Sequence, residues 1–156
     1  MIDNWPILSI VTFLPLAGVL FLLMIKGDNT TVVQNSRHVA LWVSGFTFLV
    51  SLPLFIAFDN TAAGYQFEEK AVWLAGTGIG YHMGVDGISM PFVLLSTFLT
   101  PLSILASWKA ISHRVREYMI AFLVLETMMI GMFVSLDMLM FYLFFEAVLI
   151  PMFLII

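Results

Sequence analysis

The chain has 156 residues, of which 62% are hydrophobic and 10% are charged, whereas a soluble domain carries charge on about a quarter of its residues. This composition excludes a soluble globular protein and indicates an integral membrane protein. The formal net charge is −4 and there is no cysteine, which excludes disulfides and cysteine–metal sites, and the basic residues are too few for nucleic-acid binding.

Five apolar runs follow one another, each long enough to cross a bilayer as a helix. We expect transmembrane helices at about residues 7–25, 39–58, 88–108, 118–136 and 138–156. The sequence therefore predicts an all-α integral membrane protein with a single membrane region over residues 1–156. Because the last run reaches Ile156 without a polar or basic residue to end it, we interpret the chain as a truncated, N-terminal part of a larger helical bundle.

Residues 59–87 form the longest polar segment and separate the second apolar run from the third. The stretch QFEEKAVWL has the composition of a short strand, and several glycines follow it in GTGIGYHMG. We expect an exposed loop outside the membrane that contains a short hairpin.

The basic residues predict the orientation of the helices, since loops on the cytoplasmic side are enriched in Lys and Arg. Five of the six lie in the first and third connections, which fall on the same side of the membrane: Lys26, Arg37, Lys109, Arg114 and Arg116. We therefore expect these two loops in the cytoplasm, and the N-terminus and the loop 59–87 on the outer side.

Small hydroxyl residues follow one stripe of the third predicted helix, and Pro101 interrupts the same helix in mid-span. The stripe consists of Ser89, Ser96, Thr100, Ser103 and Ser107. One interpretation is that small side chains let a neighbouring helix approach and accept hydrogen bonds. The alternative is that Ser96, Thr100 and Ser103 line a hydrated path.

The fifth run, DMLMFYLFFEAVLIPMFLII, places one carboxylate, Glu146, near the middle of a membrane helix. A charge at this depth is costly and is tolerated only against protein, water or a counter-charge, so it marks a candidate functional site. Pro151 follows five residues later and cannot donate to the carbonyl of Ala147, which breaks the helix close to the acid. We expect Glu146 to bind and release protons.

A second acid, Glu126, lies near the centre of the fourth predicted helix. Helices four and five must form an antiparallel hairpin, which puts Glu126 and Glu146 at nearly equal depth. If the two acids face each other, they can share one proton. The alternative is that Glu126 is a protonated packing group hydrogen-bonded to a neighbouring helix. The three histidines fall in loops or at helix ends, so we predict no metal site.

Three segments resemble one known family: GVDGISMPFVLL, ILASW and SLDMLMFYLFFEAVLIPMFLI. They are similar to the antiporter-like subunit M, called subunit 4 in mitochondria, of the proton-pumping NADH:quinone oxidoreductase, respiratory complex I. The motif FFEAVLIP carries the family's essential glutamate, which the resemblance assigns to Glu146. It implies that this glutamate pairs with a lysine on a later helix, beyond Ile156. Glu126 is not assigned by the family's pattern.

The resemblance also implies what the chain assembles with. It implies a subunit of an enzyme whose redox chemistry occurs elsewhere, with no cofactor in this chain and with flavin, iron–sulfur clusters and quinone in other subunits. The expected partners are other membrane subunits of complex I, including neighbouring antiporter-like subunits, and the lipid bilayer. The expected location is a bacterial inner membrane rather than a mitochondrial one.

Two alternative functions stay open. The first is a subunit of a multisubunit Na⁺/H⁺ antiporter or of a membrane-bound hydrogenase, which share the same ancestral unit. The second is a structural membrane subunit without transport, in which Glu146 is only a satisfied packing group.

Overall fold

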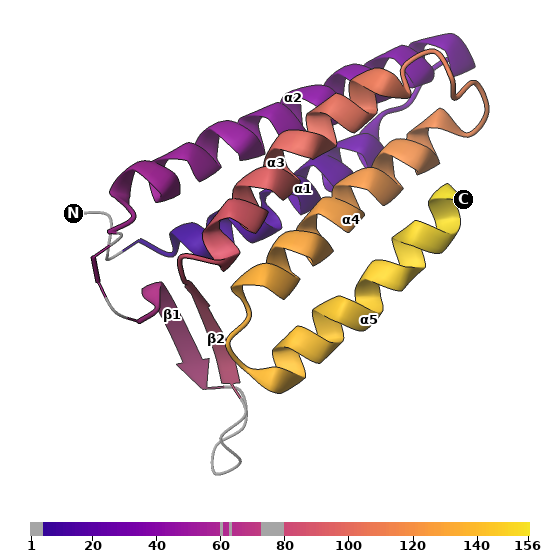
Figure 1. Ribbon diagram of the computed structural model, residues 1–156. Helices are drawn as coiled ribbons and strands as arrows, with labels where there is room; N and C mark the ends of the chain where they lie inside the picture. Colours follow the sequence, from indigo (N-terminus) through magenta and orange to yellow (C-terminus); the bar gives the residue numbers. More distant parts are fainter. Residues whose placement is uncertain (1–4, 60, 63, 73–79) are drawn as a thin grey trace.

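The computed structural model describes residues 5–59, 61–62, 64–72 and 80–156, and in these ranges it contains five long helices and a two-stranded sheet (Figure 1). The elements are α1 (Ile7–Met24), α2 (Asn29–Ala57), β1 (Gln66–Val72), β2 (Gly80–Val85), α3 (Ser89–Ala106), α4 (Val115–Val134) and α5 (Met138–Ile155). All five helices are long and apolar enough to cross a membrane, which confirms the predicted fold class.

The start of α2 differs from the prediction. The helix begins at Asn29, ten residues before the predicted residue 39, and its 29 residues span about 43 Å. The bilayer core is about 30 Å thick, and only the part of a helix inside it must be apolar. A helix can therefore continue beyond the apolar run into polar residues. The largely polar residues 29–37, which precede the predicted second helix, therefore form the first turns of α2.

Helices α1 to α4 form a four-helix bundle in which α1 and α3 each pack against both α2 and α4. Gly18 permits the close approach of α1, because a Cβ there would lie 2.7 Å from Val43 Cγ1 and 2.9 Å from Leu123 Cδ1. Helix α5 lies outside this bundle, against α4, as the yellow helix at the edge of Figure 1.

The strands β1 and β2 pair antiparallel and attach to the helices at one end of the bundle (Figure 1). Met83 of β2 pairs with Ser135, and the backbone N–H of Leu136 donates to the carbonyl of His82 at 2.9 Å. From β1, the carboxylate of Glu69 accepts the backbone N–H of Leu8 at 2.7 Å. Residues 60, 63 and 73–79 of the segment 59–87 lie outside the described residues.

The opposite end of the bundle is held by arginines. Arg37 Nη2 of α2 donates to the carbonyl of Ile111 at 2.8 Å, and Arg116 Nη1 of α4 donates to the carbonyl of Ile25, which follows α1, at 3.3 Å. A cation at the carboxyl end of a helix also interacts favourably with the helix dipole. The basic connections therefore lie together, at the end away from the hairpin.

Candidate functional site

Helix α5 carries the principal candidate residue and is fixed at its start by side-chain capping. The Asp137 carboxylate accepts the backbone N–H groups of Leu139 at 2.9 Å and Met140 at 3.2 Å, which otherwise have no partner in the first turn. One turn further along, Phe144 packs on Gly131 of α4 so closely that a Cβ on the glycine would lie 2.4 Å from Phe144 Cε1. The glycine thus sets how closely α5 can approach α4.

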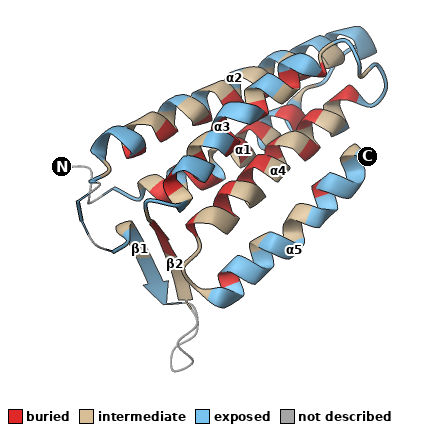
Figure 2. Ribbon diagram, viewed as in Figure 1, coloured by how far each residue is buried: buried red, intermediate tan, exposed pale blue. Residues whose placement is uncertain are grey.

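Glu146 is exposed on α5, and among the described residues its carboxylate makes no hydrogen bond or ion pair. Only two residues of α5 are buried, Met140 and Pro151. Figure 2 shows the result: α5 is mostly pale blue, whereas the neighbouring α4 is mostly red and tan. Glu146 therefore lies on a face of α5 that these residues leave uncovered.

Pro151 and Glu146 lie on different faces of α5. The two residues are five positions apart, which corresponds to about 140° around the helix axis, and Pro151 is buried whereas Glu146 is exposed. Pro151 lines a groove of about 680 Å³ between the end of α5 and the start of α4. The polar residues that line the groove include His113, Arg114 and Glu117.

Glu126 is buried inside the α1–α4 bundle, with 1% of its surface exposed. Neither carboxylate oxygen has a hydrogen-bond partner among the described residues. The structure therefore does not bring Glu126 and Glu146 together: equal depth along the α4–α5 hairpin does not make the two acids face each other.

The hydroxyl stripe of α3 is bonded mainly within its own helix. Ser96 donates to the carbonyl of Phe92 at 2.8 Å and Thr100 to the carbonyl of Ser96 at 2.9 Å; both residues are buried, and Ser103 is half-buried. The hydroxyl contact between α2 and α3 is made by Thr97, which lies 3.0 Å from Ser51 Oγ. Whether the stripe is hydrated stays a prediction, as does any role for the break at Pro101.

Two polar networks of the hairpin were not predicted from the sequence. In one, Glu69 accepts from the backbone N–H and the hydroxyl of Ser9, and that hydroxyl also contacts the Tyr81 hydroxyl, which joins the hairpin to the first turn of α1. Pro6 provides no side-chain cap for α1, so Glu69 supplies it from a distant strand. No local sequence signal could have revealed this, because Glu69 and Ser9 are 60 residues apart.

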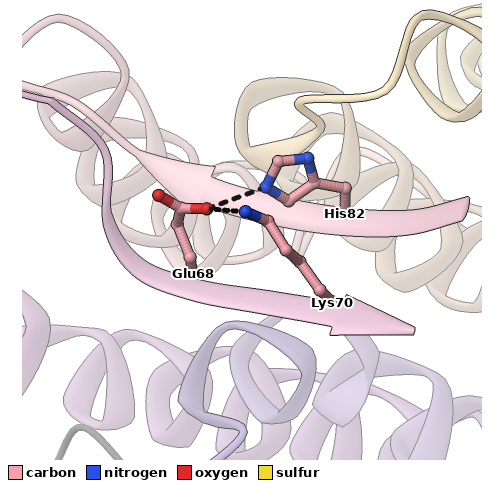
Figure 3. A network of polar contacts seen from close by, with 3 residues as sticks. All are labelled: Glu68, Lys70 and His82. Atoms are coloured by element: carbon pink, nitrogen blue, oxygen red, sulfur yellow. Dashed lines mark hydrogen bonds and ion pairs between the residues drawn. The ribbon is translucent and has the colours of Figure 1, made fainter. Parts of the chain in front are cut away.

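The second network is on the outer surface of the hairpin (Figure 3). Glu68 Oε2 lies 2.7 Å from Lys70 Nζ and 2.9 Å from His82 Nε2. The hydrogen bond from Lys70 makes the largest contribution, and that from His82 the next, to lowering the pKa of the Glu68 carboxyl from its ordinary value. Within the described ranges no group of three or more His, Cys, Asp or Glu side chains could hold a metal ion.

Comparison with known proteins matches residues 7–135 to the family described as NADH-ubiquinone oxidoreductase chain 4, amino terminus. The chain is 54% identical over 151 residues to NADH-quinone oxidoreductase subunit M of Rhodobacter capsulatus, covering 96% of this chain and 29% of that protein. It is 46% identical over 149 residues to NADH-ubiquinone oxidoreductase chain 4 of Marchantia polymorpha, covering 96% and 30%.

A solved structure shares the fold. A chain of respiratory complex I from Thermus thermophilus with bound NADH superposes with a TM-score of 0.73 at 29% identity, over 94% of this chain and 28% of that one. The chain thus spans less than a third of the length of each of these proteins.

Proposed function

Because the chain belongs to the family described as NADH-ubiquinone oxidoreductase chain 4, amino terminus, we propose that it is part of a membrane subunit of an NADH:quinone oxidoreductase. In this proposal the subunit translocates protons, coupled to electron transfer elsewhere in the complex. The chain itself carries out no redox chemistry. Flavin, iron–sulfur clusters and quinone belong to other subunits.

Glu146 is the proton-binding carboxylate in this proposal. One observation carries it: an ionisable side chain lies in the middle of a membrane helix, on a face that the described residues leave open. Since an isolated carboxylate in lipid is costly, we propose that this face of α5 packs against the remaining part of the longer protein. A lysine there would be the counter-charge whose movement changes how tightly Glu146 holds its proton.

Glu126 is a second carboxylate to which we assign proton exchange, in an environment separate from that of Glu146. The hydroxyls of Ser96, Thr100 and Ser103, beside Pro101, are proposed to lie along a hydrated route. Pro151 is proposed to keep the helix near Glu146 able to bend.

The proposed partners are the other membrane subunits of complex I, including neighbouring antiporter-like subunits. We propose a bacterial inner membrane, with the N-terminus and the hairpin on its outer side. This orientation is supported by the gathering of Arg37 and Arg116 at the end opposite the hairpin, since cytoplasmic ends are rich in basic residues.

The relatives described above favour this function over a Na⁺/H⁺ antiporter, a hydrogenase or a structural subunit, since their names are those of NADH oxidoreductase subunits. Co-purification with flavin and iron–sulfur subunits would support the proposal. Sodium-dependent transport without such subunits would instead support an antiporter.

The test is Glu146→Gln in the full-length subunit within the assembled complex. Glutamine keeps the shape of the side chain but cannot carry a proton, so we expect NADH-driven proton pumping to fall by about tenfold or more. Pumping is measured in membrane vesicles, and assembly is checked by the NADH oxidation that artificial acceptors support.

The matched control is Glu117→Gln, which makes the same chemical change at a surface carboxylate paired with Arg114 at 2.6 Å. Since exposed ion pairs contribute little, this variant should pump normally. Normal pumping by an assembled Glu146→Gln complex would refute the assigned role and favour the structural alternative.

A further inference from the structure

On the facing helices α1 and α4, three buried polar side chains have no hydrogen-bond partner among the described residues. The carboxylate oxygens of Glu126 and the hydroxyls of Thr12 and Thr127 are buried and have no hydrogen-bond partner among the described residues. The exposed fraction is 1% for Glu126 and 0% for each threonine. Buried polar groups in native proteins are nearly always satisfied, by protein or by ordered water, so a cluster of them needs an explanation.

Most other buried hydroxyls of the bundle are bonded, with Ser36 near the opposite end of α2 as an exception. Thr47 donates to the carbonyl of Val43 at 2.9 Å, and Ser51 donates to the carbonyl of Phe48 at 2.7 Å. Threonine can satisfy itself in this way within a helix. Thr12 and Thr127 do not; Thr12 lies on α1 and Thr127 on α4, next to Glu126 in the sequence, and these two helices pack against each other.

The register of α1 and α4 places the three side chains at similar depth. The two helices are antiparallel, because α1 begins and α4 ends at the hairpin, and Gly18 meets Leu123 where they touch. Counted from that contact toward the hairpin, Thr12 is six residues along α1, and Thr127 is four residues along α4. The difference of two residues corresponds to about 3 Å of axial distance.

Pro15 adds a backbone acceptor to this layer. It is buried, and it lies three residues from Gly18, as Glu126 lies three residues from Leu123. A proline has no N–H to donate to the carbonyl four residues earlier, here that of Val11. The layer therefore offers a carboxyl, two hydroxyls and a backbone acceptor, which is enough for the two to four hydrogen bonds that a buried water makes.

We propose that Glu126, Thr12 and Thr127 form an internal water-binding site in which the Glu126 carboxyl exchanges its proton with bound water. The O–H bond of the carboxyl breaks, the electron pair stays on the carboxylate, and the proton leaves on water as hydronium; the reverse step restores the acid. The two hydroxyls hold the water. This inference rests on the proposed function only in assigning proton exchange to Glu126, and it needs no pumping.

Infrared spectroscopy of the resting complex with the full-length subunit tests the proposal. A band of the protonated carboxyl that disappears in Glu126→Gln should shift when the complex is transferred from H₂O to D₂O. In the double variant Thr12→Val, Thr127→Val this shift should be about tenfold slower, as expected for the loss of a hydrogen bond that supports the exchange. The measurement involves no turnover. Its result therefore does not depend on whether Glu146→Gln abolishes proton pumping.

The matched control is Thr47→Val, which removes a buried hydroxyl that is already bonded to Val43 and should leave the exchange rate unchanged. Thr127→Ser keeps the hydroxyl and should also exchange at the normal rate, which guards against a folding defect in the double variant. A carboxyl band that does not shift in D₂O, the absence of such a band, or an unchanged rate without both hydroxyls would each overturn the proposal.

Discussion

The α1–α4 bundle and helix α5 are similar in apolarity but differ in how they are packed. Nine residues of α4 are buried, whereas α5, of nearly equal length, buries two. Each region holds one membrane carboxylate: Glu126 is enclosed by the bundle, and Glu146 lies on an open face of α5. The two acids therefore occupy different environments: Glu126 is enclosed by this chain, whereas Glu146 is left open, and we propose that the rest of the longer protein covers it.

The largest expected loss of stability comes from a substitution that disturbs the contact between α4 and α5. Gly131→Ala would place a Cβ 2.4 Å from Phe144 Cε1, so the Phe144 ring must shift or α5 must move away from α4. We expect destabilisation of about 1–3 kcal/mol, as for other overpacked sites. The measurement is the midpoint of thermal unfolding of the full-length subunit, together with the distance between spin labels on α4 and α5.

Gly45→Ala is the control for this change, since Gly45 lies in α2 and nothing lies within 4 Å of its Cβ position. Replacing a glycine inside a helix by alanine should there be neutral or stabilising, by up to about 1 kcal/mol. Combining Gly131→Ala with Phe144→Leu should recover part of the loss. If Gly131→Ala behaved like Gly45→Ala, the close α4–α5 contact would be wrong.

A smaller loss of stability should follow from a substitution at Glu69, which joins the hairpin to the start of α1. Glu69→Gln removes the charge that accepts the N–H groups of Leu8 and Ser9 at the start of α1. We expect a loss of about 1 kcal/mol, seen as roughly fivefold faster amide hydrogen exchange in the first turn of α1. Helix α5 should be unaffected.

The neighbouring Glu68→Gln serves as the comparison, because Glu68 is exposed and, among the described residues, its ion pairs are with Lys70 and His82 of the hairpin. It should leave exchange in α1 unchanged. Equal acceleration by the two substitutions would mean that Glu69 does not cap α1.

The smallest expected effect is a pH dependence of the stability of the hairpin. The pKa of Glu68 is lowered in the folded state by its hydrogen bonds with Lys70 and His82. Its contribution is therefore present above the ordinary carboxyl pKa and is lost as the pH falls through the lowered value. The protection of β1 amides, relative to their intrinsic exchange rate at each pH, should fall in that acidic range, and Glu68→Gln should abolish this change in protection. A wild-type hairpin with pH-independent protection would contradict this.

The five helices could be predicted from the sequence because the apolar runs are long and separated by polar segments. The start of α2 could not, since its first turns are polar and lie beyond the apolar run. For α5 the sequence located Glu146, but the helix is apolar on all sides, and such a pattern does not reveal which face a neighbour covers.

The orientation of Glu126 was equally hidden. Depth follows from counting residues along a helix, but the direction of a side chain depends on packing between α4 and the other helices. Thr12 carried no signal as a single hydroxyl residue in the first apolar run. Thr12 becomes a candidate only in the structure, because Gly18 brings α1 against Leu123 and so places Thr12 close to the level of Thr127.

The separation of the two acids is tested most directly by the infrared band of the Glu126 carboxyl in a complex that carries Glu146→Gln. If the acids occupy separate environments, the band should keep its position and its rate of exchange in D₂O, whether or not pumping is lost. A band that shifts or disappears on this substitution would show that the two carboxyls share a proton, and would contradict the account.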